Sequence, residues 1–264
     1  MTNVTLMQSR DKALAGRSPR QAGLEKARQA LDWVYRWGYS SASVLDSLSG
    51  AKRRGLSARL VKQGLLKSTR TESGGAVKGV PQAILTLTPL GLSDVERWRE
   101  SLLPYELDAY RYRQDQLRHY MLAQMATAKG LADGRLGGFA TEKELAERSA
   151  AGVKQPDVLW YLPGGNTIGV EVELSAKWGR DLDMFVLACL NAIQRDNDGV
   201  PTRFNQVAVA SDSPAILKRY KAAFAPGATY GLWQKDARSR WEKVGTRQVP
   251  QWAKERMQWQ QLMY

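Results

Sequence analysis

Three carboxylates, Asp157, Glu171 and Glu173, stand out because they interrupt a strongly apolar part of the chain. The apolar runs 156–162 and 167–174 flank a Pro-Gly-Gly-Asn turn, which predicts a β-hairpin. Side chains two residues apart on a strand share a face, so Glu171 and Glu173 point the same way, and Asp157 can face the same pocket. Converging carboxylates resist burial unless a cation holds them. Oxygen ligands suit Mg²⁺ or Mn²⁺, so we expect all three acids to bind one such ion.

Lys177 follows the second strand and would add a positive charge beside this ion. In phosphodiester cleavage, a carboxylate-bound divalent ion activates water and polarises the phosphate. We therefore expect Asp157 and Glu171 to be ligands, and Glu173 to be a ligand or a general base acting through water. Lys177 would stabilise charge on the phosphate. The alternative is a solvated strand face with scattered acids, which the apolar flanks disfavour.

The same residues carry a family resemblance, through Pro156-Asp157 and then Val170-Glu171-Val172-Glu173-Leu174-Ser175-Ala176-Lys177. This pattern resembles the core of PD-(D/E)xK restriction-endonuclease-like proteins. More narrowly, it is similar to replication-relaxation proteins and MobC-type plasmid relaxases, which place that core behind a winged helix. The family has lysine where Glu173 stands, and Lys177 is offset from that position.

The resemblance implies a metal-dependent endonuclease or relaxase, with Mg²⁺ or Mn²⁺ as its cofactor. Its substrate would be double-stranded DNA in a supercoiled plasmid, nicked at a plasmid or integrative-element transfer origin, and accessory mobilisation proteins would be its partners. The resemblance also implies one more acid from the helix ahead of the hairpin, for which Glu142 and Glu144 are the candidates. Thr141 and Glu144 have the spacing of a capping box, which gives Glu144 a structural explanation as well.

The positive charge of the chain favours a nucleic-acid partner. The formal net charge is +13, and residues 1–100 hold 17 Lys and Arg against 8 Asp and Glu. Basic surfaces bind nucleic acid because neutralised phosphates release counterions. Simple solubility is the alternative, but it does not explain why the excess is localised. Residues 1–20 are expected to form a disordered basic arm that can touch DNA.

Residues 21–92 are expected to form a winged-helix DNA-binding domain. Apolar periodicity predicts helices over 24–37, 41–48 and 51–63, and two strands joined by a Gly-rich turn follow within 69–88. The third helix would enter the major groove, as recognition helices do. The alternative is a small helical bundle with a solvated basic face. The basic residues expected to face DNA are Lys52, Arg53, Arg54, Arg59 and Lys62.

The rest of the 264-residue chain is long enough for a second core. We expect a helical connector over 93–130, a nuclease-like core over 131–240 and a C-terminal tail over 241–264. From Thr141 the predicted order is helix, strand, strand, helix, strand, helix, strand, which indicates a mixed sheet and an α+β fold overall. In the tail, Trp252 and Trp259 would either stack on single-stranded bases or belong to a helix docked on the core, and the docked helix is preferred.

Several classes of site are excluded by composition. His119 is the only histidine, so a histidine cluster of the common relaxase type and zinc-hydrolase signatures cannot form, and a packing or phosphate-contacting role is favoured for it. Cys189 is the only cysteine, lies in an apolar run and is expected to be buried, which leaves no disulfide frame. No apolar stretch has the length of a membrane span or a signal peptide, so a cytoplasmic protein is expected.

Two further interpretations stay open. Attack by a tyrosine is the rival chemistry, although structural roles are favoured for the tyrosines near the domain junction, Tyr105, Tyr110, Tyr112 and Tyr120. The protein would otherwise be a non-catalytic winged-helix replication or regulatory protein with a degenerate nuclease fold, or an endonuclease subunit of a transposition system.

Overall fold

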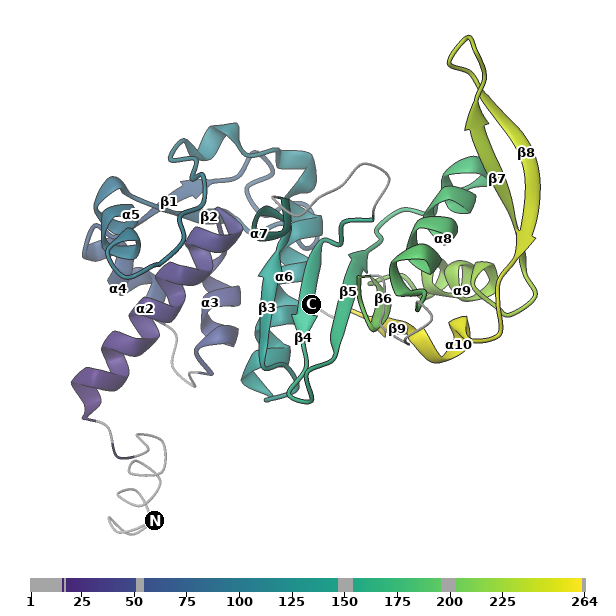
Figure 1. Cartoon of the computed structure of the whole chain (residues 1–264). Helices are drawn as coiled ribbons and strands as arrows, with labels where there is room; N and C mark the ends of the chain where they lie inside the picture. The colour runs from purple at the N-terminus through teal and green to yellow at the C-terminus, as the bar shows by residue number, and fades with distance from the viewer. Residues whose placement is uncertain (1–15, 17, 51–54, 147–153, 196–202, 263–264) are drawn as a thin grey trace. The chain divides into compact units, whose positions relative to one another are not determined.

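The computed structural model describes residues 16, 18–50, 55–146, 154–195 and 203–262. The chain divides into two compact units, Met1–Gln114 and Asp115–Tyr264. Both units combine helices with antiparallel strands, and the second adds parallel ones, which confirms the α+β class (Figure 1). Within the described ranges, no helix has the length and apolar character needed to cross a membrane.

In the described residues of the first unit, three α-helices are followed by a hairpin and a further α-helix. Their bounds are α2 (Pro19–Trp37), α3 (Ala42–Leu48), α4 (Leu56–Lys62), β1 (Leu66–Arg70), β2 (Ala83–Leu87) and α5 (Pro89–Glu96). A capping box between Ser18 and Gln21 starts α2, and Gly38, with φ 87°, ends it. A Cβ at Gly91 would lie 2.1 Å from the Leu65 oxygen, so only glycine lets α5 approach the start of β1 this closely.

The expected helical connector over 93–130 is helical in its second part, which belongs to α6 (Leu117–Ala132), but mostly not in its first. Residues 97–108 are not helical, and two short 3₁₀ turns follow at Ala109–Arg111 and Gln114–Gln116. Tyr105 folds back onto the first unit, where its hydroxyl donates to the Gly38 oxygen at 2.7 Å and accepts from the Leu87 N–H at 2.7 Å. The boundary between the units therefore lies inside the expected connector, because buried tyrosine hydrogen bonds hold its first half in the first unit.

The second unit is built on a five-stranded mixed sheet of order β3-β4-β5-β6-β9. The strands are β3 (Gly138–Thr141), β4 (Val158–Tyr161), β5 (Thr167–Val172), β6 (Gln206–Ser211) and β9 (Met257–Gln261). The first three pair antiparallel and the last three pair parallel. Each parallel step needs a crossover connection, which α8 (Gly179–Ile193) supplies before β6 and α9 (Pro214–Ala223) before β9.

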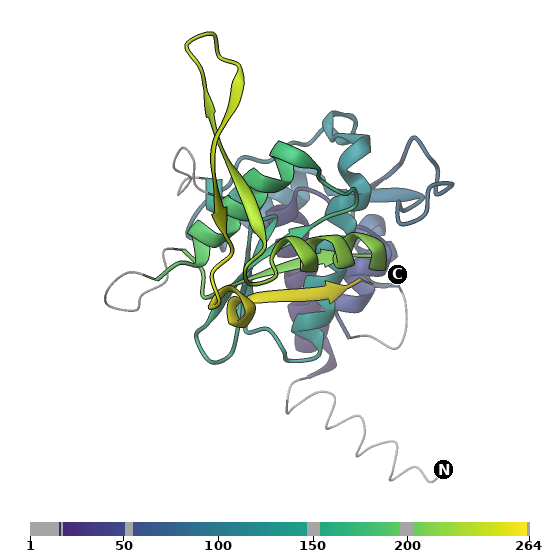
Figure 2. The same ribbon diagram turned by 90° about the vertical axis from the view of Figure 1, so that its right-hand side faces the viewer.

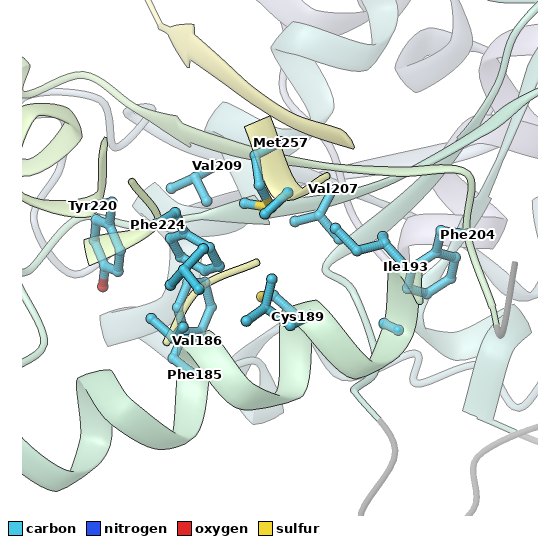
Figure 3. Packing of buried hydrophobic residues seen from close by; sticks show 14 of the residues in the cluster. Phe185, Val186, Cys189, Ile193, Phe204, Val207, Val209, Tyr220, Phe224 and Met257 are labelled. Atoms are coloured by element: carbon cyan, nitrogen blue, oxygen red, sulfur yellow. The ribbon is translucent and has the colours of Figure 1, made fainter. Parts of the chain in front are cut away.

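Helices cover both faces of this sheet. Trp160 of β4 points to one face, where its indole N–H donates to the Thr127 hydroxyl of α6 (Leu117–Ala132) at 2.8 Å. Its neighbour Leu159 points to the other face and joins the buried cluster formed with α8 and α9. Figure 3 shows this cluster, in which Cys189 is fully buried, as expected.

The predicted hairpin is confirmed, but the end of the chain differs from expectation. Residues 241–264 were expected to form a tail with a docked helix. Instead the chain forms β8 (Trp241–Gln248), which pairs with β7 (Thr229–Lys235), then α10 (Ala253–Arg256) and the sheet strand β9. Met257 and Trp259 alternate with glutamines at period two, and this alternation lets β9 add to the edge of the sheet beside β6. Strand β3 is also absent from the predicted order, which begins at Thr141, the last residue of this strand.

Candidate active site on the central strands

Glu171 lies on β5, in the middle of the sheet, and its side chain is only 5% exposed. A carboxylate in such a place requires a cation or a hydrogen-bond donor. Lys154 supplies the cation, with its Nζ 2.6 Å from Glu171 Oε2. The ammonium group also lies 5.6 Å from the centre of the Phe185 ring of α8. Sequence reasoning missed Lys154, although its place two residues before Pro156-Asp157 was the available signal.

Glu173 is buried on the same side of the strand as Glu171, as the two-residue spacing predicts. Its Oε1 forms an ion pair with the Nζ of Lys177, and its Oε2 accepts a hydrogen bond from the Tyr220 hydroxyl at 3.0 Å. The Lys177 Nζ lies 4.7 Å from the centre of the Phe185 ring, so two ammonium groups flank one aromatic ring. The Glu173 N–H donates to the Ala210 oxygen at 2.8 Å, which extends the pairing of β5 with β6 past the end of β5.

Asp157 lies opposite Glu171, where β4 begins. Its N–H donates to the Val170 oxygen at 3.0 Å, and its Oδ2 accepts from the Val172 N–H at 2.7 Å. The same Oδ2 lies 3.1 Å from Nε2 of His119, on α6. Asp157 therefore ties the hairpin to the helix on the other face of the sheet. The sequence favours a packing or phosphate-contacting role for His119, and the structure pairs it with the first acid of the site.

The surroundings of the site shift the pKa values of Glu171 and His119. Burial raises the pKa of Glu171 to about 8, against the opposing effect of Lys154, and the charges on Asp157 and Glu173 raise it further. Burial lowers the pKa of His119, but the Asp157 carboxylate outweighs this effect and the net shift is upward. The site therefore gathers negative charge that favours a proton or a cation.

The predicted metal site is not preassembled. Among the described residues, no group of three His, Cys, Asp or Glu side chains is arranged to hold a metal ion. Asp157, Glu171 and Glu173 each face a different partner: His119 for the first, and one lysine for each of the others. The two ammonium groups carry the same total charge as one divalent ion. In this donor set, the buried oxygens of Glu171 and Glu173 fit a hard cation only when the lysines move aside.

The acids expected from the preceding helix have other partners. Helix α7 (Glu142–Ala146) begins with the predicted capping box: Glu144 Oε2 accepts from the Thr141 N–H at 2.8 Å, and Thr141 Oγ1 accepts from the Glu144 N–H at 3.4 Å. Glu142 Oε2 accepts a hydrogen bond from the Tyr120 hydroxyl at 2.8 Å. Both carboxylates thus have structural partners outside the set of three acids on the hairpin.

The tyrosines expected near the junction divide into two kinds. Tyr105 and Tyr112 are packed in the first unit, and burial raises the pKa of both phenols. Tyr110 is 77% exposed, and Tyr120 holds Glu142. A fifth tyrosine, Tyr220, donates a hydrogen bond to Glu173, but it is fully buried and burial raises its pKa, so its role is to orient Glu173.

The expected DNA-binding residues are only partly covered by the structure. Lys52, Arg53 and Arg54 lie outside the described residues. Lys62 is exposed on α4, while the Arg59 Nη2 donates to the Gly23 oxygen of α2 at 3.4 Å. No protein-family model matches this sequence, and comparisons with curated proteins and with solved structures find no match.

Proposed function

We propose that this protein is a metal-dependent DNA endonuclease that nicks duplex DNA, of the kind represented by replication-relaxation proteins and MobC-type relaxases. The observation that carries the proposal is the pair Glu171 and Glu173, two buried carboxylates on one side of a central strand with a lysine on each. Burying the two carboxylates costs several kcal/mol of desolvation, which a purely structural sheet has no need to bear. Asp157 at the head of the neighbouring strand completes the acid set that the resemblance implies.

The chain's own residues would divide the work of cleavage among them. Asp157, Glu171 and Glu173 would hold Mg²⁺ or Mn²⁺, which when bound would activate water and polarise the phosphate. Lys154 and Lys177 are 23% and 36% exposed, so the solvent side of the site is positively charged. This charge attracts a phosphodiester, and an ammonium group released from its carboxylate would neutralise the phosphate oxygens.

The order of elements in the first unit supports a DNA substrate. Its helix, helix, helix and hairpin follow one another as in a winged helix. The proposal places DNA along α4 and the β1–β2 hairpin, with Lys52, Arg53, Arg54, Arg59 and Lys62 toward the phosphates. A plasmid or integrative-element transfer origin would then be the substrate, and accessory mobilisation proteins the partners.

The decisive experiment is nicking of a supercoiled plasmid in the presence of Mg²⁺ or Mn²⁺. Glu171→Gln keeps the shape of the side chain and removes its charge, so nicking should fall at least about a hundredfold while duplex binding persists. Glu255→Gln, an exposed acid of α10, is the matched control and should nick like the wild type. Equal nicking by Glu171→Gln and the wild type would overturn the assignment, and a nicked strand that stays bound to protein after denaturation would favour a tyrosine nucleophile.

A second function is favoured by one specific observation, the complete pairing of the acids. In the structure Glu171 and Glu173 already have cations, and Asp157 has a histidine and a backbone donor. If these contacts are permanent, the protein is a non-catalytic DNA-binding replication or regulatory protein. The wild type would then bind duplex DNA and leave the plasmid intact with either ion.

A further inference from the structure

The strands β7 and β8 form a two-stranded antiparallel ribbon that is separate from the main sheet. The pairing runs from Thr229↔Gln248 to Lys235↔Trp241, with a bulge beside Leu232 and Trp233. Figures 1 and 2 both show the ribbon extending beyond α8. Its base is anchored, because Tyr230 and Val249 belong to the buried cluster under α8 and α9. A two-stranded ribbon is only marginally stable in water by itself. A bound partner would therefore stabilise its projecting half, residues 233–243, which lies beyond the bulge.

The projecting half of the ribbon is positively charged. Its exposed cations are Lys235, Arg238, Arg240 and Lys243, and the exposed Arg247 lies nearer the base, opposite Tyr230. The same segment contains two acids, Asp236 and Glu242. Asp236 is used inside the tip, where its Oδ1 accepts from the Arg238 and Arg240 N–H groups at 2.8 Å and its Oδ2 pairs with Arg240 Nε at 3.0 Å. The outward surface therefore presents an excess of cations.

Aromatic contacts stiffen the ribbon against α8. The Trp233 indole N–H donates to Asp183 Oδ2 at 2.9 Å. The Trp241 ring has the Arg180 guanidinium 5.3 Å and the Lys235 ammonium 5.4 Å from its centre. Arg180 also pairs with Asp181 at 2.8 Å, so the cation that these contacts hold in place with its charge available to an anion is Lys235. Ordering this cation in advance lowers the entropy that a partner must remove on binding.

We propose that the β7–β8 ribbon is a second duplex-DNA contact, which enters the major groove and binds the phosphates on either side. A two-stranded ribbon fits the major groove, about 12 Å wide. The three pairs beyond the bulge, from Trp233↔Lys243 to Lys235↔Trp241, extend by about 3.3 Å per residue, and together with the turn 236–240 they give roughly 10 Å or more, enough to reach into a groove about 8.5 Å deep. Within residues 229–248, repeated cations and a single exposed large apolar side chain, Val244, favour phosphate over a protein surface. The inference rests on the proposed action on DNA.

The test compares two triple variants with the same reduction of charge. Lys235, Arg238 and Lys243 are changed to Gln on the ribbon, and the exposed Lys129, Lys221 and Lys254 are changed to Gln elsewhere in the second unit. Duplex binding is followed by fluorescence anisotropy from about 50 to 200 mM salt, on the full chain. The ribbon variant should bind on the order of tenfold more weakly, and its log–log salt slope should shrink by about 0.9 for each phosphate that the ribbon no longer neutralises. The control should match the wild type.

The outcomes separate this inference from the proposed function. The ribbon contact alone would be overturned if the ribbon variant binds duplex DNA with the affinity and salt slope of the wild type. It would also be overturned if the ribbon variant and the control triple variant lose the same amount of duplex affinity. Weakened binding of single strands but not of duplex would overturn its place in the major groove. If the wild type binds DNA through the ribbon but never nicks a plasmid, the proposed nuclease activity is wrong and the ribbon contact is still supported. A wild type that binds no duplex would overturn both.

Discussion

Two acid–base pairs of the second unit show how position changes the behaviour of the same chemical groups. Glu171 and Lys154 meet beside the sheet with side chains 5% and 23% exposed, whereas Asp236 and Arg240 meet at the ribbon tip with side chains 15% and 68% exposed. Burial raises the pKa of Glu171 to about 8. At the tip, hydrogen bonds from the Arg240 backbone lower the pKa of Asp236. Loss of water dominates the first pair and local donors dominate the second.

This difference indicates what each pair is for. A buried ion pair gains little stability over an apolar pair of similar volume, so its presence points to a use other than folding. An exposed pair costs little and contributes little. The tip of the ribbon uses Asp236 to shape a turn, and the exposed cations around it remain available to a partner. Three substitutions probe this contrast, from the largest expected effect to the smallest.

Replacing Lys154 with Met should have the largest effect on stability. Above pH 8, where the Glu171 carboxyl beside Lys154 is ionised, the change leaves this buried acid without its cation, so the free energy of unfolding in urea should fall by about 3 kcal/mol. The double variant Lys154→Met with Glu171→Gln should recover most of this stability, because a neutral amide replaces the unpaired charge. A single variant as stable as the wild type would show that this pair is not what balances the buried acid.

Glu144 lies between the two extremes, since it is half-buried and holds the start of α7. Glu144→Ala should cost about 1 kcal/mol of stability, and combining it with Thr141→Ala should cost less than the sum of the two changes. Nicking by the folded variant should be unchanged. Abolished nicking with intact folding would move Glu144 into the active site, as the family resemblance implies.

Asp236→Asn should have the smallest effect, below what an unfolding curve resolves. It should speed hydrogen exchange of the Arg240 amide, from which the carboxylate accepts a hydrogen bond at 2.8 Å. Because the folded pKa is lowered, the contribution of Asp236 is present above its unfolded pKa, about 3.9, and disappears as the pH falls through the lower folded value. In the wild type, a protection factor of the Arg240 amide, corrected for the intrinsic pH dependence of exchange, should fall only in this acid range, and a protection factor that falls toward neutral pH would contradict the sign.

Local patterns in the sequence were enough to predict the hairpin, the shared side of Glu171 and Glu173, the capping box of α7 and the burial of Cys189. Each of these depends on residues close together in the chain, where the two-residue period of a strand or the geometry of a helix start leaves little choice. The α+β class followed in the same way from the order of elements.

The partners of the acids were decided only by the tertiary structure. The Tyr220 hydroxyl reaches Glu173 across 47 residues of sequence, Asp157 meets His119 from another helix, and Lys154 turns toward Glu171 across the hairpin. The pairing of β9 with β6 and the projection of the ribbon depend in the same way on which surfaces the rest of the sheet leaves open. The types and spacing of residues determined where charge would be buried, but the cation that balances it is chosen by long-range packing, which no local period encodes.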